Sequence, residues 1–282
     1  MNEHPPLSPG LYIVATPIGN LGELSPRAAD ILARVDAIAV EDSRVTARLL
    51  QHIGVKRPMI PYHDHNAAHV RPQILARLGG QAIALVSDAG TPLISDPGFK
   101  LVREARAQGH DITTVAGPCA AIAALTLAGL PTDRFLFAGF LAARDGARRQ
   151  ELAELAGIRA TLVFYESGQR LGASLSAMAG VLGDREAAVA RELTKKFEEV
   201  ATGRLSELAA RYAESPPKGE IVVVVGPPEA AAPASADDID ALLHERLATL
   251  GVKDAAAEVA AITNQPRKAI YARALALKAA GA

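Results

Sequence analysis

The chain lacks tryptophan, and aromatic residues make up only 4% of its 282 residues. Hydrophobic residues nevertheless reach 49%, so alanine, valine, leucine and isoleucine must fill the core. There is one cysteine, Cys119. A single cysteine cannot form an internal disulfide, which excludes the disulfide-stapled class of secreted domains and is typical of a reducing compartment.

The sequence also lacks an excess of charge of either sign and any long apolar run. Thirty Lys and Arg face 31 Asp and Glu, a formal net charge of −1. The chain therefore has no overall positive charge that would indicate a nucleic-acid partner, and any nucleic-acid site must rest on a local group of basic residues. No run approaches the roughly 20 apolar residues of a membrane span, and residues 1–10 carry no basic, apolar signal segment. These absences predict a cytoplasmic protein with no membrane partner.

Strand and helix patterns alternate along the first part of the chain, which is typical of a mostly parallel α/β sheet. The expected strands there are 11–16, 37–40, 59–62, 82–86 and 112–115. Further expected strands, at 135–139, 161–165, 187–191, 198–202 and 221–225, indicate a second α/β domain with a mixed sheet. The predicted organisation is an α/β domain over 1–130, a second over 131–226, a Pro/Ala-rich linker over 227–236 and an all-helical domain over 237–282.

The most informative segment is 87–98, directly after the apolar run 82–86. It combines two acids, two glycines, two prolines and three hydroxyls. A turn that only reverses the chain needs far fewer glycine, proline, acidic and hydroxyl residues than this segment contains. Loops at the carboxyl ends of parallel strands are where open α/β sheets bind ligands. The segment therefore predicts a ligand-binding loop, with a capped strand-to-helix turn as the plainer alternative.

Three other stretches follow predicted strands. Residues 15–22 (ATPIGNLG) lack the three-glycine dinucleotide fingerprint, although the acidic pair Glu41-Asp42 stands where a ribose would be held. Residues 116–121 are small, which suits either a flat ligand or tight helix–sheet packing. Residues 191–199 are dense in charge and form either a solvated hairpin or a lid over a cleft between the domains.

Two further features, the histidine-containing segment 62–66 and Cys119, predict neither a metal site nor a catalytic nucleophile. Residues 62–66 (YHDHN) match no zinc-ligand spacing and have no second cluster, so no metal is expected. Cys119 has no histidine nearby in the sequence and is interpreted as a small buried hydrophobe.

Seven motifs occur in one order between residues 11 and 226. They are VATPIGNLG (14–22), EDSR (41–44), YH (62–63), the segment 87–98, GPCA (117–120), YES (165–167) and the segment 191–199. Together they resemble the ribosomal RNA small-subunit methyltransferase I family, which has the tetrapyrrole-methylase fold. The chain departs from that pattern at Gly168-Gln169, where the family commonly has Pro-His.

The resemblance implies two α/β domains with a cofactor cleft between them, S-adenosylmethionine as the cofactor, and a homodimer. It also implies 2′-O-methylation of a cytidine in the decoding region of 16S ribosomal RNA, either free or within the assembled small subunit. Carried over by motif, the cofactor-binding residues are Pro17, Asp88, Ala89, Gly90, Ile94, Ser95, Ala116, Gly117, Phe164, Tyr165, Leu193, Gly219 and Glu220.

Methylation of a ribose hydroxyl needs help with its proton. The hydroxyl is a poor nucleophile until that proton is lost or shared, so a nearby carboxylate or lysine would assist. Charge and position make Glu192 and Lys195 the leading catalytic candidates, with Asp88 placed to touch the cofactor or the hydroxyl.

The last part of the chain separates its charges. Residues 237–263 hold six acids, whereas residues 264–282 hold none. A short turn before Pro266 predicts a helix-turn-helix with one basic face able to reach phosphates, and an ordinary solvated helical pair is the alternative. The resemblance favours RNA. The predicted RNA-binding residues are Arg267, Lys268, Arg273 and Lys278 here, with Arg144, Arg148 and Arg149 at the edge of the second domain.

Three other functions stay open on the sequence. A tetrapyrrole methyltransferase of the same fold would not need the basic tail. A nicotinamide oxidoreductase would need the missing glycines. A ligand-sensing helix-turn-helix regulator would not need two elaborate α/β domains.

Overall fold

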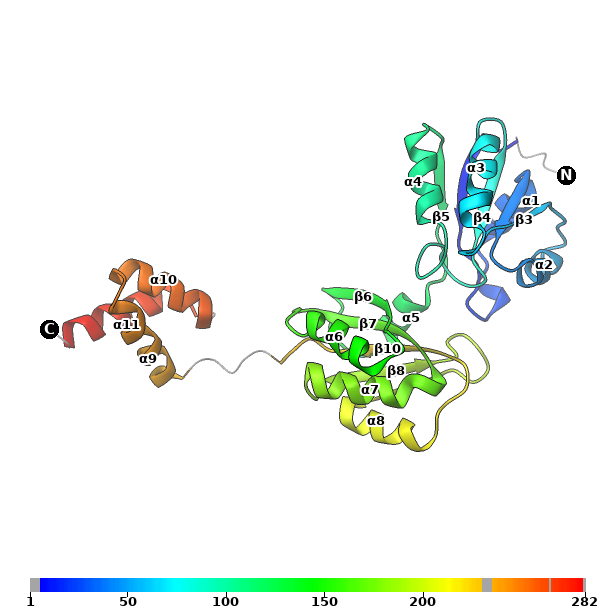
Figure 1. Cartoon of the computed structure of the whole chain (residues 1–282). Coiled ribbons are helices and arrows are strands. Elements are labelled where there is room, and N and C mark those ends of the chain that lie inside the picture. The colour runs from blue at the N-terminus through cyan, green and yellow to red at the C-terminus, as the bar shows by residue number, and fades with distance from the viewer. Residues whose placement is uncertain (1–5, 230–234, 264, 281–282) are drawn as a thin grey trace. The chain divides into compact units, whose positions relative to one another are not determined.

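The computed structural model describes residues 6–229, 235–263 and 265–280. Their contacts divide the chain into two compact units, Met1–Pro228 and Glu229–Ala282, and Figure 1 labels most of the elements of each. Within the described residues, no helix is both long and apolar enough to span a bilayer.

The larger unit begins with a sheet of five parallel strands in the order β3-β2-β4-β1-β5. They are β1 (Gly10–Val14), β2 (Ala37–Val40), β3 (Met59–Pro61), β4 (Ala82–Val86) and β5 (Ile112–Val115). Between and after them lie η1 (Leu21–Glu23), α1 (Pro26–Arg34), α2 (Ser43–His52), α3 (Ala67–Leu78), α4 (Phe99–Ala107) and α5 (Ala120–Leu127). The predicted parallel sheet is confirmed.

Both faces of this first sheet are covered, which explains why its strands are continuously apolar. In β4, Ala84 and Val86 pack in a cluster with residues of α1 and α2. The alternate residues Ile83 and Leu85 pack with α3 and α4. Helix α1 begins where the sequence predicts, because Ser25 accepts a hydrogen bond from Ala28 N at 3.1 Å and proline occupies the first turn.

A second sheet follows in the order β6-β7-β10-β8-β9. Its strands are β6 (Phe135–Phe140), β7 (Thr161–Ser167), β8 (Glu186–Arg191), β9 (Glu199–Arg204) and β10 (Glu220–Val225). β6 and β7 are parallel and the other neighbours are antiparallel, so the predicted mixed sheet is confirmed. One face packs on α6 (Asp145–Leu155), α7 (Gly168–Leu182) and α8 (Leu205–Glu214), of which α7 and α8 lie side by side (Figure 1).

Helix α5 covers the other face of the second sheet. Its residues Ala121, Ala124 and Leu125 pack in one cluster with Val163 of β7 and Val224 of β10. Because α5 leaves the end of β5, this packing joins the carboxyl end of the first sheet to the second sheet within one compact unit.

The smaller unit is helical, as predicted. It contains α9 (Ala236–Leu247), α10 (Val252–Thr263) and α11 (Arg267–Ala280) around a core that includes Leu243, Val259 and Ile270. Helix α9 starts at the last residue of the predicted linker, capped by a reciprocal pair of hydrogen bonds between Ser235 and Asp238, each 3.1 Å long. The middle of that linker, 230–234, lies outside the described residues.

Candidate functional site

A cleft of about 410 Å³ lies in the larger unit, a size suited to a small molecule. One side is made by loops of the first sheet: Ile18, Glu41, Asp88, Ala89, Gly90, Thr91, Ile94, Ser95 and Asp96. The other side comes from the start of α5 and from the second sheet: Cys119, Ala120, Phe140, Tyr165, Glu166, Ser167, Leu193, Gly219, Glu220, Ile221 and Val222. The cleft therefore opens at the carboxyl ends of β2 and β4, where parallel sheets bind ligands.

Two loops on the first side of the cleft are joined by backbone hydrogen bonds. Thr16 N donates to Gly90 O at 2.8 Å, and Gly90 N donates back to Thr16 O at 3.0 Å. Gly90 has a φ of +76°, and a Cβ there would lie 3.2 Å from Cγ2 of Ile18. This position therefore needs glycine both for its backbone conformation and for the close approach of the neighbouring loop.

The 87–98 loop also stores strain. Leu93 and Ser95 are not glycines, yet their φ angles are +75° and +65°. Such conformations cost of order 1–3 kcal/mol each and persist only where the surroundings fix them. The segment is thus more than a turn, and the strained Ser95 lines the cleft.

Three carboxyl groups meet on the first side of the cleft. Burial is the main cause that raises the pKa of Glu41, Asp88 and Asp96, and repulsion from neighbouring acids adds to it. Asp88 Oδ1 also accepts a hydrogen bond from Asp42 N at 2.9 Å, which fixes that carboxyl group. A ligand with positive charge would favour the ionised forms of all three groups.

The opposite wall is aromatic. The Tyr165 ring meets the edges of Phe137 and Phe140, with centroids 4.9 and 5.5 Å apart. Burial, with the nearby Cys119, raises the pKa of the Tyr165 phenol, so it stays protonated at neutral pH. This wall offers an apolar surface with one hydroxyl group.

Glu192 and Lys195 form an ion pair at the rim. Lys195 Nζ donates to Glu192 Oε1 at 3.0 Å and to Glu220 Oε2 at 2.9 Å. The hydrogen bond from Lys195 is the main cause that lowers the pKa of Glu192. Burial alone would lower the pKa of Lys195, but its bonds to Glu220 and Glu192 outweigh burial and raise it. Both side chains therefore stay charged at neutral pH.

Two glycines make room for this pair. A Cβ on Gly19 would lie 2.4 Å from Cγ of Lys195, and one on Gly219 would lie 2.3 Å from Oε1 of Glu192. Lys195 thus extends from the turn after β8 onto the loop after β1, and connects the two sides of the cleft. Neither charged residue lines the cleft, whereas the adjacent Leu193 and the paired Glu220 do.

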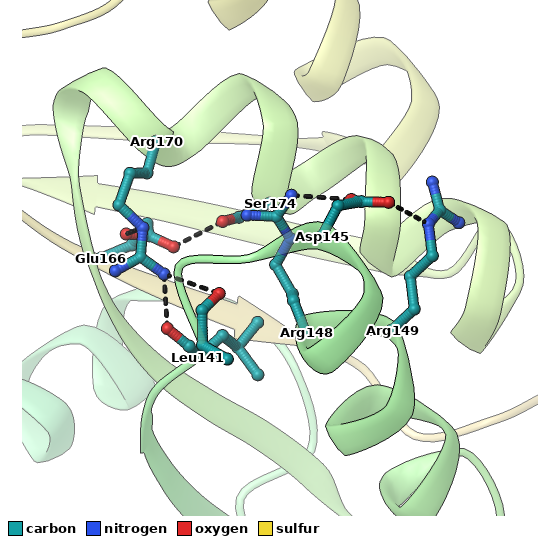
Figure 2. Close-up of polar contacts among 8 residues, drawn as sticks. Leu141, Asp145, Arg148, Arg149, Glu166, Arg170 and Ser174 are labelled. Carbon is teal, nitrogen blue, oxygen red and sulfur yellow. Dashed lines mark hydrogen bonds and ion pairs between the residues drawn. The ribbon is translucent and has the colours of Figure 1, made fainter.

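A buried network supports the aromatic wall from behind. Glu166 is 3% exposed and accepts hydrogen bonds from Ser174 Oγ at 2.5 Å and Ser167 N at 2.8 Å. Arg170 Nε lies 3.3 Å from Glu166 Oε1, and its Nη2 donates to the backbone of the loop after β6, at Leu141 (Figure 2). The network ties the end of β7 to α7 and to that loop, which fixes Tyr165.

Comparisons with known proteins agree with this geometry. Residues 10–209 match the family model described as Tetrapyrrole (Corrin/Porphyrin) Methylases, and residues 233–278 match the one described as RsmI C-terminal HTH domain. A Mesorhizobium japonicum protein named Ribosomal RNA small subunit methyltransferase I is 51% identical over 276 residues, covering 97% of this chain and 94% of that protein. One of the same name from Erythrobacter litoralis is 55% identical over 275 residues, covering 97% of each.

The chain belongs to the ribosomal RNA small subunit methyltransferase I family. The resemblance seen in its seven motifs is thereby confirmed, and the chain is a methyltransferase. Two solved structures share the fold of the larger unit. Diphthine synthase has a TM-score of 0.61 at 14% identity, covering 77% of this chain and 89% of its own. A cobalt precorrin-4 methyltransferase has a TM-score of 0.56 at 17% identity, covering 77% and 94%.

Most cofactor positions carried over from the family lie around the cleft. Those that line it are Asp88, Ala89, Gly90, Ile94, Ser95, Tyr165, Leu193, Gly219 and Glu220. Phe164 does not, because side chains alternate along a strand and its ring is fully buried against α7 and α8 instead. Pro17 is buried, and Ala116 and Gly117 are exposed, without lining the cleft. A Cβ on Gly117 would lie 2.9 Å from Cβ of Ala15, so glycine at this position allows the two loops to pack closely.

Sequence reasoning missed part of the site. Asp96 and Thr91 lie inside the predicted loop but were not singled out. Glu41 stands in the EDSR motif and was considered as a ribose ligand of a nicotinamide enzyme, but it was not named as a cofactor residue, although it directly follows β2, the neighbour of β4. The strand-end rule could have found it. Phe140 and Ile221 carry no local signal, because only the second sheet brings them to the cleft.

Of the cluster predicted at Arg144, Arg148 and Arg149, the structure corrects one member, Arg148. The Arg148 side chain is only 6% exposed and pairs with Asp145 at 2.8 Å (Figure 2). Arg149 shares that partner at 2.8 Å, and Arg144 is exposed at the start of α6. Because the apolar stem of Arg148 is packed and its head is paired, it is not available to a phosphate.

The tail cations also differ from one another. Arg273 donates to both carboxylate oxygens of Asp240, at 2.7 and 2.5 Å, and so ties α11 to α9. Arg267, Lys268 and Lys278 are exposed and form no ion pair with any described residue. The basic face is therefore narrower than predicted.

In the 62–66 segment, the ring centroids of His63 and His65 lie 6.0 Å apart. Among the residues that the structure describes, no group of three or more His, Cys, Asp and Glu side chains is arranged to hold an ion.

Proposed function

We propose that this chain transfers a methyl group from S-adenosylmethionine to the 2′-hydroxyl of a cytidine in the decoding region of 16S ribosomal RNA. The observation that carries the proposal is the cleft at the carboxyl end of the first sheet, closed by the second sheet, in a chain of this family. The names of the relatives support ribosomal RNA as the substrate.

The residues of the cleft fit this cofactor. S-adenosylmethionine carries positive charge on its sulfonium and amino groups, and the carboxyl groups of Glu41, Asp88 and Asp96 lie on one side of the cleft. Gly90 lets the backbone approach a ligand, and Leu193 and Tyr165 offer apolar surface to a flat base. When bound, the cofactor supplies a methyl group already activated by its sulfonium, so the task of the protein is alignment and exclusion of water.

The rim residues handle the hydroxyl in this proposal. Glu192 stays ionised because of Lys195, and its carboxylate accepts a hydrogen bond from the ribose hydroxyl and then its proton. A lowered pKa makes Glu192 a weaker base, so holding the hydroxyl in line is part of its role. Lys195 positions Glu192, and Asp88 lies on the cofactor side of the cleft.

The remaining parts follow from the family. The helical tail engages the small-subunit RNA, free or assembled, through its exposed cations. We expect a homodimer, which sedimentation of the purified chain tests directly. We also expect the protein to act in the cytoplasm, where ribosomal subunits are assembled.

The decisive experiment offers one labelled donor to three acceptors: purified small subunits, naked 16S RNA and a tetrapyrrole. Label should appear in RNA, at one cytidine whose 3′ phosphodiester becomes resistant to alkali because its 2′-oxygen is methylated. Label in the tetrapyrrole alone would support the small-molecule alternative instead. Absence of transfer to any acceptor, with ligand binding retained, would support a sensing regulator. Calorimetry should show binding of S-adenosylmethionine and none of NADH.

A further inference from the structure

One face of α11 combines exposed cations with exposed apolar side chains. Arg267, Tyr271, Leu275 and Lys278 follow one another at spacings of four, four and three, and Lys268 lies three residues before Tyr271. Residues three and four apart share a helix surface, so these five side chains form one stripe, here named the α11 face. Tyr271 is 41% exposed and Leu275 is 47% exposed.

The orientation of this face is fixed by the core of the smaller unit. Ile270 and Ala274, on the neighbouring face of α11, are 3% and 0% exposed and pack against residues of α9 and α10. The bidentate pair between Arg273 and Asp240 adds a polar tie to α9. Tyr271 and Leu275 are therefore held outward, although their burial would be favourable.

The charged side chains of α11 itself all have one sign. No acid occurs in residues 264–282, and the described part of the smaller unit gives Arg267, Lys268 and Lys278 no ion-pair partner. An aromatic ring flanked by unpaired cations complements a partner that presents both flat rings and regularly spaced negative charge. Unpaired RNA has this chemistry, because its bases are open to stacking beside its phosphates.

We propose that the α11 face binds unpaired nucleotides of the RNA substrate. The Tyr271 ring stacks on one base, Leu275 contacts the same nucleotide, and the three cations neutralise the flanking phosphates. Duplex RNA fits poorly, because its bases are stacked inside and its deep groove does not admit side chains. The proposal rests on the proposed function for the identity of the RNA, and it assigns to Arg273 a role in holding the fold.

The test measures fluorescence anisotropy of the full chain with a labelled single-stranded RNA of the decoding region and with the same sequence annealed to its complement. Tyr271→Ala should weaken single-strand binding about tenfold, because stacking on one base is lost. Tyr271→Phe, which keeps the ring, should bind like the wild type. Arg106→Ala, which removes an exposed cation at the end of α4, is the control and should change nothing.

Salt dependence separates stacking from charge. Tyr271→Ala should leave the slope of log K against log salt unchanged, whereas Lys268→Ala should flatten it by about 0.7. The proposal is overturned if Tyr271→Ala binds single strands as tightly as the wild type, or if duplex binding falls equally. It is also overturned if the variants affect only assembled subunits and leave naked RNA binding unchanged, because the face would then contact a ribosomal protein.

Methyl transfer to the same RNA, measured in parallel, keeps the two proposals apart. If the wild type methylates RNA but Tyr271→Ala binds and methylates RNA normally, the proposal for the α11 face is overturned and the proposed function stands. If binding depends on Tyr271 but the wild type methylates neither this RNA nor purified small subunits, the proposed function fails and the proposal for the α11 face stands.

Discussion

The cleft and the α11 face use charge in opposite ways. In the cleft, Glu41, Asp88 and Asp96 are partly buried together, and their pKa values rise because they lose water. On α11, Lys268 and Lys278 stand in solvent with no acid near them in the sequence. Clustered, desolvated acids suit one small cationic ligand of defined shape. Exposed cations suit a long polyanion, whose attraction depends on salt rather than on fit.

Glu192→Gln should give the largest effect and should separate chemistry from both kinds of binding. We expect the rate of methyl transfer to fall by about 10²–10⁴-fold, because the carboxylate that accepts the hydroxyl proton is lost. Donor and RNA affinities should stay close to the wild type. Single-turnover methylation at saturating donor and RNA measures the chemical step. A rate equal to the wild type across neutral to alkaline pH would remove Glu192 from the catalytic candidates.

Replacing Arg267, Lys268 and Lys278 together by alanine should test the exposed side of the comparison. RNA affinity at low salt should drop by about tenfold or more, and the salt slope should flatten by about 2, because three fewer phosphates are neutralised. Donor affinity should not change. The matched variant Arg273→Ala removes a cation engaged by Asp240 and should lower thermal stability more than RNA affinity. Equal loss of RNA affinity in both variants would contradict this distinction.

Gly90→Ala should test the shape requirement of the cleft. Donor affinity should fall by about tenfold, because alanine disfavours a φ of +76° by roughly 1–2 kcal/mol and its Cβ would press on Ile18. Gly109→Ala is a close control, since Gly109 has a φ of +78° and nothing within 4 Å of an added Cβ. It should lower the melting temperature without altering donor affinity in calorimetry. Comparable loss of affinity in both would mean that backbone strain alone matters.

The smallest effect should be a dependence of donor affinity on pH. Raised pKa values mean that the cleft acids become protonated at a higher pH than free carboxyl groups. Binding of a cation should therefore weaken as pH falls through those raised values and reach a plateau above them. Calorimetry with the donor from pH 4 to pH 8 should show that the affinity changes by a few-fold, as expected when about one carboxyl group changes its protonation state. Asp96→Asn should reduce this dependence, and a profile identical to the wild type would exclude Asp96 from it.

Local pattern was enough for much of the fold. The ends of β2, β4 and β5 agree with the prediction, because short apolar stretches that contain β-branched residues and are bounded by turn residues favour buried strands. Ser25-Pro26 placed the start of α1 for a similarly local reason. Within the site, the 87–98 loop was found because its composition exceeds what a turn needs, but Phe164 was assigned to the cleft although the strand alternation turns it away.

The sequence by itself determined the parallel and mixed sheets, the ligand-binding loop, the helical tail and the absence of acid from its last helix. These properties depend on neighbours a few positions apart, which the sequence shows directly. Only the tertiary structure decided that Glu41 lines the same cleft as Asp88 and that Tyr165 packs against α5. It also decided that Arg148 is buried and that Arg273 forms an ion pair with Asp240. Strand order, facing and ion pairing are set by contacts between segments far apart in the chain, so no local pattern could specify them.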